Sequence, residues 1–190
     1  MNKPYPITDL KQLKALTSPV RGEILDIVNL MGSLSIAEMA EYVGKPIDSL
    51  YYHVRKLVKV GLLVNVAKRK SKRQMEAIYD LPGRPMFLRY VPSQTEYVEN
   101  VIKSIATMLR LTERNFRNAF EKDLIKVSDS RRNVEHVRVI GWHTEKEIHE
   151  IRMQIRKIIN TFNSSAKNRK KTSNLFALTT ILMPLEVKKR

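Results

Sequence analysis

The chain has 190 residues and carries 35 lysines and arginines against 19 aspartates and glutamates, a formal net charge of +16. This excess favours nucleic acid or an anionic membrane as the partner, and the membrane is disfavoured because no apolar run is long enough to span a bilayer and no signal-peptide pattern opens the chain. The absence of cysteine excludes disulfides, thiolate metal sites and cysteine nucleophiles, and it fits our expectation of a cytoplasmic protein.

Two amphipathic helices are expected first. Leucines at three-residue steps, Leu10 to Leu16, predict a helix that begins at Thr8 or Asp9. Ser18 followed by Pro19 is a typical start for a second helix, and Gly32 is expected to end it. The apolar stripe of this second helix is Val20, Ile24, Ile27, Val28 and Met31.

The next two predicted helices have the order of a helix-turn-helix. In "SIAEMAEYVG" the spacing of Ser35 and Glu38 is that of a capping box, and Gly44 stops the helix. After a short turn through Pro46, a fourth helix buries Leu50, Val54 and Leu57. Two short helices joined by a glycine-containing turn are typical of this DNA-binding motif.

After the fourth helix, the repeat of apolar side chains along the sequence changes from 3.6 residues, typical of a helix, to two residues, typical of a strand. "LLVNVA" and "MEAIYDL" alternate and flank the polar stretch "KRKSKRQ", which predicts a β-hairpin with a basic, mobile tip. "PGRP" follows, so we expect a domain boundary near residue 85, with a first domain at 1–85 and a second at 86–190.

Two helices and two strands are expected in the second half. A long helix from about Thr95 to Asp123 carries an apolar stripe, and a second helix begins at the capping box of Thr144 and Glu147. "VEHVRVIGW" and "LFALTTILMPL" are strand-like, and "NSSAKNRKKTSN" is expected to be a basic linker that is solvated. The stripe of the long helix is Val98, Ile102, Ile105, Leu109, Phe116 and Phe120.

Together these elements give a mainly α fold with a β-hairpin wing, plus a C-terminal α+β segment with a long helix. The runs "LTSPVRGEILDIV", "SIAEMAEYVGKPIDSLYYHVRKLVKVGLL" and "RQMEAIYDL" resemble the ArsR-type winged helix-turn-helix transcriptional regulators over about residues 8–81. The resemblance implies a DNA-binding regulator, and the lack of cysteine excludes its thiolate metal sensors. The second half loosely resembles regulators that add a dimerisation and effector segment after the wing.

The fourth helix offers its outer side to a major groove. Residues 1–50 hold five basic and six acidic side chains, whereas Ser49–Arg73 holds eight basic side chains and no acid. We assign base readout to Ser49 and Tyr52, and contacts with phosphate or base edges to Arg55 and Lys56. The remaining candidates on this helix are Tyr51, His53 and Lys59. We expect the basic side chains at the wing tip to contact phosphates or the minor groove. They are Lys68, Arg69, Lys70, Lys72 and Arg73.

Plainer interpretations stand beside these. A charged outer helix face is usually only solvated, and the basic tip is alternatively a disordered loop with no partner, although its place beside the recognition helix favours DNA contact. Tyr51 is as readily a packing residue in the protein interior. His53 is alternatively a residue on the flank of the helix that bonds to backbone or phosphate. Asp48 is alternatively an anion that is favoured at the start of a helix.

The second half predicts a homodimer. A helix of nearly thirty residues with one apolar stripe needs a partner surface, which is either its own chain's helix of Ile148 to Phe162 or a second subunit. His136, Trp142 and His143 near a strand-to-helix junction are candidates for the pocket of an unknown small-molecule effector, although a lone tryptophan is more often a core anchor.

No catalytic motif is present, so we expect no enzyme, no cofactor and no metal site. The preferred function is a sequence-specific, repressor-like transcriptional regulator that binds double-stranded DNA as a homodimer. The alternative is a winged helix that organises DNA without sequence preference or docks onto a protein.

Overall fold

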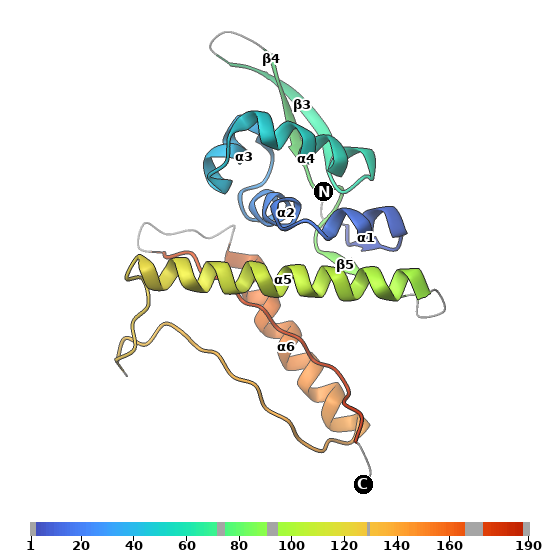
Figure 1. Ribbon diagram of the computed structural model, residues 1–190, viewed down its shortest axis with the longest axis vertical. Helices are drawn as coiled ribbons and strands as arrows, with labels where there is room; N and C mark the ends of the chain where they lie inside the picture. The colour runs from blue at the N-terminus through green and yellow to red at the C-terminus, as the bar shows by residue number, and fades with distance from the viewer. Residues whose placement is uncertain (1–2, 72–74, 91–94, 129, 166–172, 188–190) are drawn as a thin grey trace.

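The computed structural model describes residues 3–71, 75–90, 95–128, 130–165 and 173–187 (Figure 1). It confirms the predicted fold class, a mainly α fold with a β-hairpin wing and a C-terminal segment with a long helix, although the strands expected in that segment are not formed. In chain order the elements are β1 (Tyr5–Ile7), α1 (Leu10–Leu16), α2 (Pro19–Met31), β2 (Leu34–Ser35), α3 (Ile36–Val43), α4 (Ile47–Lys59), β3 (Val64–Lys70), β4 (Met75–Asp80), β5 (Met86–Leu88), α5 (Thr95–Glu121) and α6 (Glu145–Ser165).

The first helices begin and end where their capping residues predict. Asp9 caps α1 by accepting a hydrogen bond from the Lys11 N–H at 2.6 Å. Ser35 and Glu38 form the predicted capping box of α3, and Gly44 ends this helix at φ +67°, in the left-handed region that favours glycine. Ser18 lies at the start of α2, but its side chain makes no capping hydrogen bond.

A single hydrophobic core lies beneath the helix-turn-helix. The predicted stripe of α4, Leu50, Val54 and Leu57, is fully buried. It packs with Ile24 and Val28 of α2, and with residues of α1, α3 and α5, because the apolar stripes of these helices converge on one centre. The helix-turn-helix is therefore held by burial of apolar area at about 25 cal/mol per Å² rather than by polar contacts.

The wing is an antiparallel hairpin within a three-stranded sheet. β4 lies between β3 and β2, with a bulge in β3 between Asn65 and Ala67. β1 and β5 form a separate parallel pair. The three strands β1, β2 and β5 were missed, since runs of two or three residues give no usable alternation.

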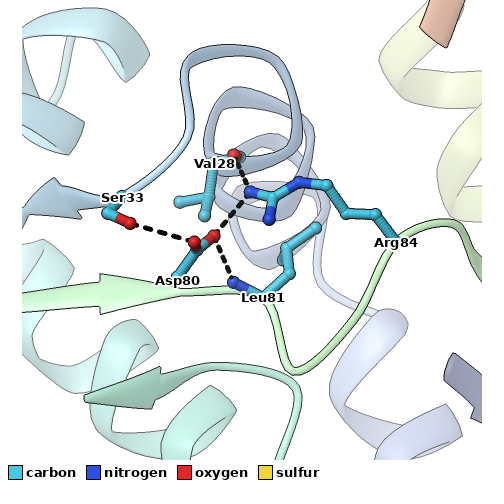
Figure 2. A network of polar contacts seen from close by, with 5 residues as sticks. All are labelled: Val28, Ser33, Asp80, Leu81 and Arg84. Atoms are coloured by element: carbon cyan, nitrogen blue, oxygen red, sulfur yellow. Dashed lines mark hydrogen bonds and ion pairs between the residues drawn. The ribbon is translucent and has the colours of Figure 1, made fainter. Parts of the chain in front are cut away.

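A polar network fixes the end of the wing to the helices (Figure 2). Arg84 donates to the Val28 carbonyl at 2.7 Å and pairs with the Asp80 carboxylate at 2.5 Å. The same carboxylate accepts hydrogen bonds from the Leu81 N–H at 2.7 Å and the Ser33 hydroxyl at 2.9 Å. β4, the turn before β2 and the C-terminal half of α2 are thereby joined at one point.

The long helix α5 packs on α1 and α2 through a face that differs from the predicted stripe. Tyr97, Val101 and Thr107 are buried, and the Thr107 hydroxyl donates to the Thr17 carbonyl at 3.2 Å. Arg114 pairs with Glu23 of α2. The stripe predicted to be buried is largely exposed, apart from the half-buried Ile105. The buried residues of α5 lie against α1 and α2, which neither of the two alternatives named as its partner surface, and the contact with a second subunit stays a prediction.

The second half departs from its predicted strands. α6 begins at the predicted capping box, where Thr144 and Glu147 exchange hydrogen bonds. The segments predicted as strands, 134–142 and 175–185, have no regular secondary structure, because a strand requires a neighbouring strand for its backbone groups. Residues 166–172 of the predicted basic linker lie outside the described residues, and the division into domains at residue 85 stays a prediction.

Candidate nucleic-acid interface

The outer side of α4 is formed by exposed polar and basic side chains. Because the buried stripe turns one side of the helix inward, the other side presents Asp48, Tyr52, Arg55, Lys56 and Lys59. Ser49 and Tyr51 are also exposed. The geometric part of the prediction, that these side chains share an accessible surface, is therefore satisfied, while their individual roles stay predictions.

Tyr52 is placed by its neighbours on the same helix. The Lys56 ammonium lies 5.6 Å from the centre of the Tyr52 ring, and the His53 ring meets that ring edge-on at 5.4 Å. These contacts restrict the tyrosine without burying it. Ser49 donates its hydroxyl to the Pro46 carbonyl at 2.8 Å, so a base contact by Ser49 requires this hydrogen bond to be shared or exchanged.

His53 lies near two basic side chains that the sequence pattern did not predict as its neighbours. Its pKa is lowered by burial and by the positive charges of Arg21 and Lys45, and its buried Nδ1 has no hydrogen-bond partner among the described residues. Arg21 comes from α2, where its Nε donates to the Ala15 carbonyl at 2.5 Å, and Lys45 comes from the turn before α4. Isolated basic residues on two other elements gave no sequence signal, since only the fold brings them together.

The basic residues of the wing divide into two groups. Lys68, Arg69 and Lys70 lie on strand β3 and are exposed, so the prediction that they form a mobile tip is wrong. The ladder pairs these three residues with Ala77, Glu76 and Met75 of β4, so the strand continues through Lys70 although none of the three is buried. Lys72 and Arg73 lie outside the described residues.

Arg69 is already paired. Its guanidinium lies 2.9 Å from a carboxylate oxygen of Glu38 on α3 and 3.8 Å from one of Glu76 on β4. Although burial alone would raise it, the pKa of Glu38 is lowered by hydrogen bonds from Ser35 and Arg69, so the carboxylate is charged at neutral pH. Among the residues that the structure describes, Arg69 is thus the one of the three strand cations whose charge is offset before any partner arrives.

The predicted effector residues are placed on the surface. His136, Trp142 and His143 are all exposed, and His136 meets the Phe116 ring of α5 edge-on at 6.4 Å. Trp142 is therefore not the core anchor that its position beside glycine also allowed. The effector pocket stays a prediction.

Within the described ranges, no group of three or more His, Asp or Glu side chains is arranged to hold a metal ion. In the same part of the chain, none of the helices has the length and apolar character needed to cross a membrane.

Comparisons with known proteins agree with the helix-turn-helix. A family model described as a helix-turn-helix domain matches residues 16–66, which is less than half of the chain. No curated protein matches the chain.

Two solved structures show distant similarity. One is RV1404 from Mycobacterium tuberculosis, at 15% identity over 59% of this chain and 80% of the other, with a TM-score of 0.29. The other is a multiple antibiotic-resistance repressor (MarR) from Listeria monocytogenes, at 16% identity over 80% of this chain and 72% of the other, with a TM-score of 0.26. Superpositions this loose support no argument about function.

Proposed function

We propose that the protein is a sequence-specific DNA-binding transcriptional regulator. The observation that carries this proposal is the adjacency of two exposed basic surfaces, the outer side of α4 after Asp48 and the strand β3 that follows it, both within Ser49–Arg73, which contains no acidic residue. The match of residues 16–66 to a helix-turn-helix domain supports it, because that domain reads DNA with its second helix.

Each surface has a distinct role in this proposal. α4 enters the major groove, where Ser49 and Tyr52 contact bases and Arg55 and Lys56 contact bases or phosphates. Lys68 and Lys70 contact the sugar-phosphate backbone beside the groove. Access is open, since most of α6 and of residues 173–187 lies on the other side of α5 from α4 and the wing (Figure 1).

The proposal also includes the finer predictions. The protein acts as a repressor-like homodimer in the cytoplasm and binds rather than catalyses. Its second half carries the dimer contact and a site for a small effector near Trp142. The ArsR-type resemblance of residues 8–81 supports the regulator function but gives no ligand.

Selection of bound duplexes from a random pool tests sequence reading. We expect enrichment of one motif by the wild-type protein and a changed motif for Tyr52→Ala. The matched variant, Lys68→Ala with Lys70→Ala, is expected to keep the wild-type motif and to weaken binding to all duplexes alike.

The salt dependence gives an independent measure of the phosphate contacts. If about six phosphates are neutralised, the slope of log affinity against log salt is near −5, and the wing double variant reduces its magnitude by about 1.8. A slope near zero contradicts DNA binding, and identical behaviour of the two variants contradicts the division of roles.

A second candidate is a winged helix that binds DNA without sequence preference or docks onto a protein. The observation that favours it is the spread of charge, because positive residues also exceed acidic ones in the second half of a +16 chain. A pool selection that yields tight, salt-dependent binding without any enriched motif supports this candidate instead.

A further inference from the structure

The second half of the chain has no core of its own. None of the described residues after Thr107 is buried, although this region is rich in large apolar side chains. The most exposed of them include Val137 (74%), Val139 (81%) and Trp142 (85%). Monomeric proteins rarely leave apolar surface of this extent in contact with water, so the surface indicates a missing partner.

Two extended segments contribute most of this surface, residues 134–142 and 174–187. In the described part of the chain, neither takes part in a strand ladder or makes a backbone-to-backbone hydrogen bond to another segment. Side-chain contacts attach them to α5: the Phe116–His136 ring contact and a hydrogen bond of 2.7 Å between the hydroxyls of Thr112 and Thr179. Both have the composition of strands, and both lack the neighbour that a strand requires.

The helix α6 covers only part of the C-terminal segment. Thr180 and Leu182 line an open cavity of about 280 Å³ together with four residues of α6, which are Arg152, Ile155, Arg156 and Ile159. The apolar side of α6 therefore touches the extended chain without closing over it.

The low net charge of these two segments indicates which kind of molecule binds them. Residues 134–142 hold one acid, Glu135, and one base, Arg138, and residues 174–187 hold only Glu186. In a chain with a net charge of +16, these two segments are themselves nearly neutral, so they attract nucleic acid or an acidic protein less than the rest of the surface does, and a second copy meets less repulsion here than elsewhere. A two-fold axis here also supplies each extended segment with a strand neighbour of matching chemistry.

We infer that two copies of the chain pair through residues 134–142 and 174–187, which become strands of one intersubunit sheet covered by the α6 helices. This inference rests on the homodimer of the proposed function and locates its contact in the extended segments rather than in α5 alone. The surface lies across α5 from α4 (Figure 1), so pairing there leaves both helix-turn-helix units accessible.

Sedimentation of the full-length chain tests the location of the contact. Val139→Asp places a charge in the proposed sheet, and Met75→Asp makes the same change at an exposed wing position outside it. We expect the wild type and Met75→Asp to be dimers at micromolar concentration, and Val139→Asp to dissociate at least tenfold more readily. A monomeric wild type, or a Val139→Asp dimer as tight as wild type, overturns the inference.

The tryptophan provides a measurement that needs no variant. Trp142 is the only tryptophan of the chain, so its emission reports on one site. We expect blue-shifted emission in the dimer and a red shift on dilution, with the same midpoint as sedimentation. A dimer whose emission is that of a fully exposed indole at every concentration contradicts pairing at this surface.

Binding to a labelled duplex of about one helical turn separates this inference from the proposed function. If wild type and Val139→Asp bind that duplex while sedimentation finds no dimer, the pairing fails and DNA binding stands. If dimers form as expected but no duplex is bound, the pairing stands and the DNA-binding proposal fails.

Discussion

Replacing Glu38 by glutamine is expected to strengthen DNA binding. In the free protein, the Glu38 carboxylate lies 2.9 Å from Arg69, so the guanidinium is held toward α3. Contact between Arg69 and a phosphate requires this ion pair to be broken or shared. Glutamine still accepts the Ser35 N–H at the third helical position, so the capping box and the helix are preserved while the charge is removed.

The magnitude follows from the exposure of the pair. The side chains of Arg69 and Glu38 are 51% and 34% exposed, and ion pairs this open to solvent contribute about 0–1 kcal/mol. Releasing Arg69 therefore increases DNA affinity by at most about fivefold. Because one more phosphate is neutralised, the slope of log affinity against log salt becomes steeper by about 0.9. The wing itself should not move, since the ladder between β3 and β4 holds the strand independently.

Fluorescence anisotropy with a labelled duplex over a series of salt concentrations measures both quantities. Glu41→Gln is the matched control, because it removes the same charge from the exposed part of the same helix and leaves Arg69 paired. We expect little change in the slope for the control. Equal effects from the two variants, or weaker binding by Glu38→Gln, would refute the reasoning that Arg69 is restrained by this pair.

Two further predictions concern titratable groups. Burial alone would raise the pKa of Asp80, but hydrogen bonds from Arg84, Leu81 and Ser33 hold it below its ordinary value. The ionised carboxylate therefore stabilises the folded protein above about pH 3.9, the ordinary pKa of aspartate. This stabilisation is lost as the pH falls through the lower pKa of the folded state. Asp80→Asn should lower the free energy of unfolding by about 1–3 kcal/mol at pH 7, and urea titrations should find a much smaller difference near pH 3; an equal difference at both pH values contradicts the role of the carboxylate. The pKa of His53 is lowered by burial, Arg21 and Lys45, whereas approaching phosphates favour the protonated ring, so DNA affinity should rise as the pH falls toward the lowered pKa of the free protein. The rise should be absent in a His53→Gln variant, and the same pH dependence in both proteins would exclude His53 as its source.

Local patterns predicted the first half of the fold well. The capping box of Ser35 and Glu38, and the stripe of Leu50, Val54 and Leu57, depend on neighbours within one turn or one helix, so their signals survive without the tertiary structure. The same holds for the exposed side of α4, since burying one side of a helix determines which residues face outward. The extent of β3 was underestimated because charged residues on an exposed strand resemble a loop.

Contacts between distant segments were beyond the sequence. Which face of α5 is buried depends on α1 and α2, and two apolar choices were open: the predicted stripe from Val98 to Phe120, or the face of Tyr97 and Val101 that the structure buries. The pairing of Arg69 with Glu38, and the grouping of Arg21 and Lys45 around His53, likewise join residues from different elements.

The sequence by itself determined the helix-turn-helix, the wing and the basic surface that they share, because helix periodicity, capping and strand alternation are local properties of the chain. Only the tertiary structure decided which cations are free and which are paired, and that the strand-like segments of the second half lack neighbours within the described chain. A strand is completed by hydrogen bonds to another segment, and no local pattern states whether that segment belongs to the same chain or to another.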